Sequence, residues 1–94
     1  MSLNFPNTSR SYDPDRGRIR FWGHDNATEV PFFLEEDALF VLYPQTAKTE
    51  AGILAAFDKA RDRIFAVAAK VYAPGGRRGF YTLTGDQFSP AASS

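Results

Sequence analysis

Apolar and polar residues alternate from Arg18 to His24, the clearest periodic stretch in the early part of the chain. Ile19 and Phe21 share one face of this stretch. Alternation with a period of two is typical of a β-strand that buries one face and exposes the other. We therefore expect a half-buried strand, with outward positions at Arg18, Arg20, Trp22 and His24.

Two further strands flank this one in the sequence. Upstream, residues 11–13 precede the segment Pro14–Gly17, in which proline and glycine favour a tight turn. Downstream, Gly23–Asn26 supplies a second turn, and alternation resumes from Thr28 to Leu34. The pattern predicts a meander of three strands, of which the first is short. Because Pro31 cannot donate a ladder hydrogen bond, we expect a free edge or a bulge near that point.

Helical spacing replaces the alternation after residue 34. The acids at 35–37 suit a helix start, and this short helix is expected to end near Tyr43 and Pro44. Beyond Thr46 or Thr49, either of which could cap a helix, apolar residues recur at alternating spacings of four and three. They are Ile53, Phe57, Ala60, Ile64, Val67 and Val71. The stripe predicts one helix of roughly 24 residues, about 36 Å long, that stops before Pro74.

A last alternating stretch, from Gly79 to Thr84, predicts a fourth strand. The order β-β-β-α-α-β indicates an α+β fold of two layers, a small and mostly antiparallel sheet with the long helix on one face. The sheet residues expected in the core are Ile19, Phe21, Val30, Phe32, Tyr81 and Leu83. A chain of 94 residues suffices for one core, so we expect a single domain over 1–94, with 1–9 and 89–94 partly frayed.

Composition narrows the possible functions. Eleven basic residues balance eleven acidic ones, so the whole molecule has no electrostatic attraction to nucleic acid or to an anionic membrane. The absence of cysteine excludes disulfides, thiolate metal sites and cysteine catalysis. No apolar run approaches the ~20 residues that span a bilayer, and the N-terminal residues lack the features of a secretory signal. We therefore expect a cytoplasmic protein without membrane contact.

The sequence contains no recognisable catalytic motif. His24 adjoins Asp25, but neighbours on a strand point to opposite faces, so we interpret this histidine as a solvated strand-end residue. Consecutive acids at 35–37 diverge around a helix, and they suit its N-terminus better than a metal. The loop 75–79 follows a helix and lacks the P-loop pattern, although its two arginines could contact phosphate or carboxylate. We expect no catalytic residue, no metal and no cofactor, and we do not expect an enzyme.

A set of short segments spread over nearly the whole chain carries a family resemblance. Besides the long helix, they are Asn4–Pro6, Tyr12–Asp13, Ile19–Phe21, Val30–Phe32, Ala38–Leu39 and Gly79–Leu83. Together they resemble the small bacterial proteins grouped as domain of unknown function 1488. The resemblance implies a two-layer α+β domain, and it implies no catalytic role for any residue.

The outward face of the second strand is the candidate binding surface. If the fourth strand lay beside the second, it would add Arg78 and Phe80 to this surface. The candidate binding residues are then Arg18, Arg20, Trp22, His24, Arg78 and Phe80. Arginines among aromatic rings on a sheet are used to stack on single-stranded nucleic acid.

Two other interpretations compete with nucleic-acid stacking. Trp22, Phe33 and Phe80 could form an apolar patch for another protein or a second copy, or an arginine could simply pack on Trp22 through a cation–π contact. We favour a non-enzymatic protein-binding or regulatory module whose outer sheet face contacts another protein, most simply a second copy. A transcription-related nucleic-acid-binding module is the alternative.

Overall fold

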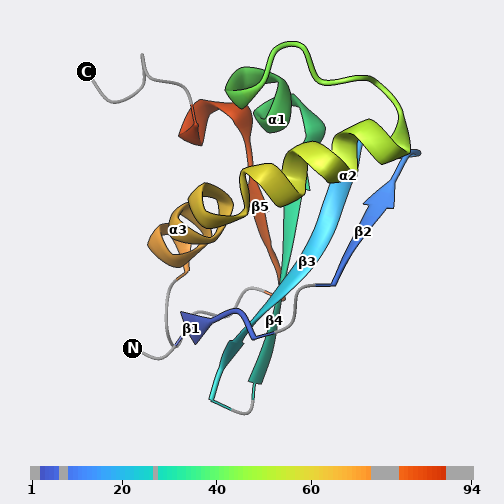
Figure 1. The fold of residues 1–94 in the computed structure, drawn as a ribbon. Coiled ribbons are helices and arrows are strands. Elements are labelled where there is room, and N and C mark those ends of the chain that lie inside the picture. Colours follow the sequence, from blue (N-terminus) through green and yellow to red (C-terminus); the bar gives the residue numbers. More distant parts are fainter. Residues whose placement is uncertain (1–2, 7–8, 27, 73–78, 89–94) are drawn as a thin grey trace.

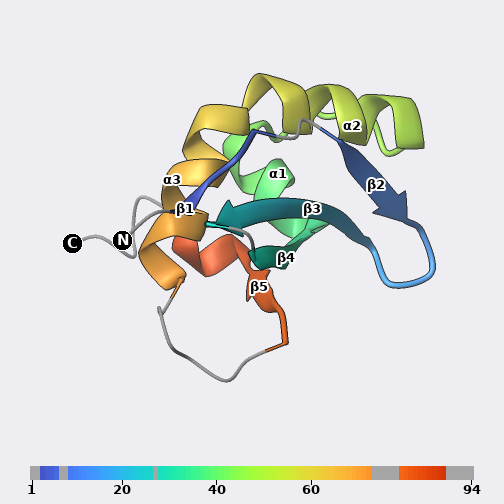
Figure 2. The same ribbon diagram turned by 90° about the horizontal axis from the view of Figure 1, so that it is seen from below.

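The computed structural model describes residues 3–6, 9–26, 28–72 and 79–88. The elements are, in order, β1 (Leu3–Asn4), β2 (Arg10–Asp13), β3 (Arg18–Asp25), β4 (Thr28–Glu35), α1 (Glu36–Leu42), α2 (Glu50–Lys59), α3 (Arg61–Val71), β5 (Tyr81–Leu83) and a 3₁₀ helix, η1 (Gly85–Gln87). The three α-helices lie on one side of the sheet (Figure 1 and Figure 2). This is the predicted α+β arrangement of two layers.

Strands β3 and β4 form the centre of the sheet. They pair antiparallel along their whole length, from Arg18 opposite Glu35 to Asp25 opposite Thr28. The other edge of β3 is shared by β2 and by β1, whose residues 3–4 fall within the range expected to be partly frayed. The sequence did not predict β1 as a strand.

The fourth predicted strand, β5, pairs parallel with β4 over Phe32–Leu34. It therefore lies beside β4 and not beside β3. A parallel pair needs a long crossover, which the three helices provide. Pro31 lies just outside the segment that β5 pairs, in keeping with the free edge expected there.

The core lies between the sheet and the helices and is rich in phenylalanine rings. All six sheet residues expected there are buried, namely Ile19, Phe21, Val30, Phe32, Tyr81 and Leu83. Phe21 and Phe32 stack with their ring centroids 5.3 Å apart. Phe57 of α2 meets Phe21 edge-on at 5.4 Å, and Tyr81 of β5 stacks on Phe32 at 5.5 Å. Since such pairs add ~0.5–1.5 kcal/mol each beyond area burial, these rings tie α2 and β5 to the central strands.

The prediction of a single long helix is wrong, because the helix is interrupted at Ala60 between α2 and α3. Ala60 has φ −95° and ψ 7°, and its N–H lies within hydrogen-bond distance of the carbonyls of both Ala56 (3.0 Å) and Phe57 (3.1 Å). Such a tightened last turn ends one helix and lets the next begin in another direction. In Figure 1, α3 is turned away from the axis of α2.

The interruption changes which helix residues reach the core. Ile64 and Ala68 of α3 are fully buried. Val67 and Val71, which the continuous stripe placed in the core, are only half-buried. The apolar stripe of α3 is therefore rotated relative to the one that the spacing predicted.

The turn between β2 and β3 is built by Asp13 and Gly17. The Asp13 carboxylate accepts hydrogen bonds from the backbone N–H groups of Asp15 at 3.1 Å and Arg16 at 3.4 Å. Gly17 has φ +62°, a conformation that costs a residue with a side chain roughly 1–2 kcal/mol. Its carbonyl accepts the N–H of Glu36 at 2.9 Å. The turn is thus anchored to the first residue of α1.

A tyrosine at the end of α3 gives a testable pH dependence. The Tyr72 hydroxyl donates to the Asp25 carboxylate of β3 at 2.5 Å. This hydrogen bond, aided by partial burial and the negative charge of Asp25, raises the pKa of Tyr72 from 10.0 to about 12. Because the folded pKa is raised, the contact stabilises the fold fully below pH 10.0 and is lost as the pH rises toward about 12.

Ring-carbon NMR of tyrosine should therefore show Tyr72 titrating near pH 12. In Asp25→Asn the acceptor is neutral, so the pKa of Tyr72 should move back toward 10.0. Tyr72→Phe should remove this resonance and identify it. An unchanged Tyr72 pKa in Asp25→Asn would contradict the assignment of the shift to Asp25.

Candidate functional site

None of the described helices covers the face of the sheet that is the lower side in Figure 2. The outward side chains of the strands belong to this face. Pairing of β3 with β4 sets these side chains in rows: Arg18 with Glu35, Arg20 with Phe33, Trp22 with Pro31, and His24 with Glu29. Thr82 of β5 extends the second row beside Phe33. We call this surface, together with Phe80, the open face.

Aromatic side chains occupy the middle of the open face. Phe80 is 52% exposed, and Val41 is the other large apolar side chain that is exposed among the described residues. The Phe80 ring meets Phe33 edge-on, with centroids 5.3 Å apart. Half-buried Trp22 lies opposite Pro31 in the neighbouring row. We call Trp22, Pro31, Phe33 and Phe80 the apolar patch.

Two arginines of β3 pack on these rings. The Arg18 guanidinium carbon lies 3.8 Å from the centroid of the Phe33 ring, and that of Arg20 lies 5.0 Å from the Trp22 ring. Exposed cation–π contacts contribute ~0.5–1 kcal/mol each. The contact that the sequence suggested for Trp22 is present, with Arg20 as its cation. One face of each ring is therefore already occupied by a guanidinium group.

A pocket of about 420 Å³ opens at the arginine end of the open face. It is lined by Ser11, Tyr12, Asp13, Pro14, Arg16, Arg18, Arg20 and Phe33. The Asp13 carboxylate accepts a hydrogen bond from Arg16 at 3.2 Å. Among the described residues, neither Arg18 nor Arg20 has an ion-pair partner. We call this cavity the arginine pocket.

Asp13, the one carboxylate that lines the arginine pocket, is held in its charged form. Burial acts to raise its pKa, but hydrogen bonds from Arg16 and from the backbone N–H groups of the turn outweigh burial and hold the pKa below 3.8. Both carboxylate oxygens accept hydrogen bonds within the turn. Asp13 therefore fixes the turn and stays ionised at neutral pH.

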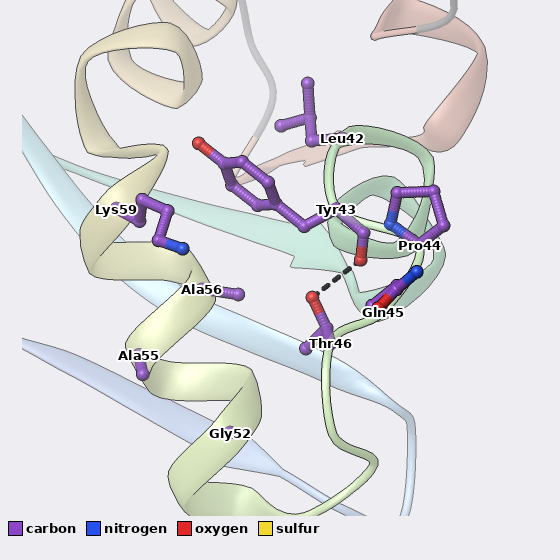
Figure 3. A pocket seen from close by; sticks show the side chains of 9 residues that line it. All are labelled: Leu42, Tyr43, Pro44, Gln45, Thr46, Gly52, Ala55, Ala56 and Lys59. Atoms are coloured by element: carbon purple, nitrogen blue, oxygen red, sulfur yellow. Dashed lines mark hydrogen bonds between the residues drawn. The ribbon is translucent and has the colours of Figure 1, made fainter.

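A second pocket, of about 410 Å³, lies between α2 and the segment that follows α1 (Figure 3). Two of its polar groups are engaged within the fold: the Thr46 hydroxyl donates to the Tyr43 carbonyl at 2.7 Å, and the Lys59 ammonium lies 5.1 Å from the Tyr43 ring. Gly52 permits the close approach of this segment, because a Cβ there would lie 2.6 Å from the Ala47 carbonyl oxygen. Lys59 is the one charged residue that lines this pocket, so it lacks the converging charges of the arginine pocket.

The structure brings together part of the predicted site. Arg18, Arg20 and Trp22 share the open face, and Phe80 joins them through Phe33 of β4 rather than through a neighbour on β3. His24 lies at the far end of the same face, opposite Glu29 and Asn4. Arg78 lies outside the described residues.

Sequence reasoning missed the pocket residues that come from β2 and from the turn after it, among them Ser11 and Arg16. Ser11 lies opposite Arg20 in the pairing of β2 with β3. The predicted hairpin could have indicated this pairing, since facing residues share a side of the sheet. Arg16 lies in the turn, where alternation gives no direction for a side chain.

Two other kinds of functional feature are absent from the described residues. In the part of the chain that the structure describes, no cluster of three or more His, Cys, Asp or Glu side chains could hold a metal ion. No helix among the described residues has the length and apolar character needed to cross a membrane.

Comparisons with known proteins agree with the fold. A family model described as "Protein of unknown function (DUF1488)" matches residues 3–84. The 1.60 Å crystal structure of a protein of unknown function from the DUF1488 family of Shewanella loihica PV-4 is similar, with a TM-score of 0.74 and 17% sequence identity over 87% of this chain and 91% of that chain. At that identity the likeness shows the fold alone. No curated protein matches the sequence.

Proposed function

The chain belongs to the DUF1488 family, whose description assigns no function. We therefore propose a function for this protein on the basis of the geometry of the open face. The protein is a non-enzymatic binding module that associates through the apolar patch with a second copy of itself. The observation that carries this proposal is Phe80, 52% exposed and packed against Phe33 on a sheet face without a helical cover. Exposed aromatic clusters of this kind are typical of protein interfaces.

The charges around the apolar patch favour a second copy as the partner. At one end of the open face, Arg16, Arg18 and Arg20 outnumber Asp13 and Glu35. At the other end, Glu29 is the charged residue opposite His24. A two-fold axis through the patch sets the basic end of one copy against the acidic end of the other, so the surface is complementary to itself.

Sedimentation of the wild type and of Phe80→Ala tests the proposal. We expect the wild type to form a dimer at micromolar concentrations and Phe80→Ala to weaken it roughly tenfold or more, as removal of an interface aromatic commonly does. Val41→Ala is the matched control, because Val41 is exposed to 41% on α1, outside the patch. A wild type that stays monomeric throughout, or equal weakening by Val41→Ala, would exclude self-association through this face.

The alternative, a nucleic-acid-binding and transcription-related module, has less support from the ring geometry. Base stacking needs open ring faces, whereas Arg18 lies on Phe33 and Arg20 on Trp22. The same proteins can be titrated with single- and double-stranded oligonucleotides at low salt. Salt-dependent binding that Arg20→Gln weakens would favour this alternative over self-association.

A further inference from the structure

The arginine pocket presents a concentration of positive charge that the fold does not use. Three of its lining residues are arginines and one is a carboxylate. Both oxygens of that carboxylate, on Asp13, are occupied within the turn. The lining thus carries a formal charge of +2, from three guanidinium groups and one carboxylate. A dianion would neutralise it.

Two of the three guanidinium groups, those of Arg18 and Arg20, are positioned by aromatic rings rather than by acidic partners. Phe33 supports Arg18 at 3.8 Å, and Trp22 supports Arg20 at 5.0 Å. Arg16 is held by Asp13, yet its side chain is 66% exposed, so donors remain for a ligand. The Arg18 Nε–H is buried and has no hydrogen-bond acceptor among the described residues. A buried donor of a charged group without an acceptor is costly in a folded protein, so the described part of the fold leaves one hydrogen bond of Arg18 unmade.

From these observations we propose that the arginine pocket binds a phosphate monoester in its dianionic form. Arginine forks match the oxygens of phosphate with paired hydrogen bonds. The Ser11 hydroxyl, opposite Arg20 in the sheet, adds a neutral donor to the lining. The pocket's volume of about 420 Å³ exceeds that of the phosphate alone and leaves room for the esterified group.

The ligand is recognised through its phosphate rather than through an aromatic ring. Phe33 is the aromatic side chain beside Arg18 in the lining. The Arg18 guanidinium covers the face of the Phe33 ring on which a nucleobase would stack. The second ring of the lining, Tyr12, donates its hydroxyl to Glu36 at 2.7 Å. The phosphate ester can come from a small metabolite or from a phosphorylated serine of a protein, and the two share the same charged group.

Isothermal titration at pH 7.5 with glycerol 3-phosphate and with a phosphoserine peptide tests the proposal. We expect saturable binding by the wild type and at least a tenfold weaker affinity in Arg20→Gln, an exposed position whose substitution leaves the fold intact. Arg18→Gln should behave alike. Arg63→Gln on α3 is the matched control, because Arg63 is exposed and does not line the pocket. Absence of saturable binding to either probe, or equal weakening by Arg63→Gln, overturns the proposal.

The two probes distinguish the sources of the phosphate. Tight binding of glycerol 3-phosphate indicates a small ester as the ligand, whereas preference for the phosphopeptide over its unphosphorylated form indicates a modified protein. Phe80→Ala should bind phosphate at least as tightly as the wild type, because Phe80 does not line the pocket and a second copy on the open face would compete for its arginines. Retained binding in that variant also makes the phosphate site independent of self-association, and lost binding there contradicts the site.

Repeating the titration at pH 5 tests the charge of the ligand. The second pKa of a phosphate ester is about 6, so we expect affinity to fall at least several-fold from pH 7.5 to pH 5. The lining groups do not change charge in this interval: the hydrogen bond to Glu36, followed by burial, raises the pKa of Tyr12 above 10.0, and that of Asp13 is held below 3.8. Equal affinity at both values would overturn the assignment of a dianion.

Discussion

Phe32→Ala is expected to lower the free energy of unfolding by about 3–5 kcal/mol, the usual effect of emptying a buried phenylalanine site. The Phe32 ring has no exposed surface and stacks on Phe21 at 5.3 Å and on Tyr81 at 5.5 Å. It therefore joins both central strands to β5. Because small domains are stable by only about 5–15 kcal/mol, this one change should bring the protein close to unfolding. Urea denaturation followed by circular dichroism measures the effect.

The adjacent residue provides a matched control for this prediction. Phe33 has the same side chain, but it points to the open face and is half-buried. Phe33→Ala removes contacts with Arg18 and Phe80 rather than core packing, so we expect a loss of about 1 kcal/mol. Equal losses in the two variants would contradict the assignment of inner and outer faces to β4.

Ile64→Ala is expected to destabilise the protein by about 2–5 kcal/mol, as truncation of a buried isoleucine does. Ile64 has no exposed surface, and it follows the interruption at Ala60, to whose carbonyl its N–H donates at 3.0 Å. The half-buried Val67 lies one turn further along α3. In a continuous helix with the predicted stripe, both residues would face the core.

Val67→Ala therefore tests the rotation of α3. With the observed helix, the loss should stay below about 1.5 kcal/mol, because a half-buried valine has less apolar surface to lose. Thermal and urea denaturation of Ile64→Ala and Val67→Ala in parallel give the comparison. Similar losses in the two variants would mean that the stripe continues past Ala60 without rotation.

The long central strands could be predicted from the sequence because each buries a single face. In β3 and β4, alternation alone places Ile19, Phe21 and Phe32 in the core, and all three are buried there. Strand β1 escaped prediction because its residues 3–4 are too few to show a period. Alternation also says which side of β5 faces inward, but it does not say which strand β5 pairs with.

The interruption at Ala60 had no local signal. Alanine is the best helix former, and no glycine or proline lies between residues 53 and 71. Only packing of two helix segments on the sheet changes the direction at this point, and packing is not visible in residue spacing. Local propensity therefore predicted a continuous helix, which the tertiary contacts overrode.

The candidate site was predictable in part for the same reason. The outward positions of β3 follow directly from its alternation, so Arg18, Arg20 and Trp22 were found. Arg16 was not, because its place beside them depends on the turn that Gly17 makes with a positive φ. The arginine pocket thus combines strand residues with a turn residue. The alternating pattern of a strand predicts which side its residues face, but it makes no such prediction for a turn.

The shortness of β5 links folding to binding. Its three residues hold the edge of the sheet, with Tyr81 and Leu83 inward and Phe80 just before them on the open face. So short an edge is expected to open before the central strands, which exposes its amide hydrogens to exchange with solvent. A partner that covers Phe80 holds the strand in place and slows that exchange. By mass action it also raises the melting temperature as its concentration rises, so the melting temperature of the protein becomes a measure of how fully the open face is occupied.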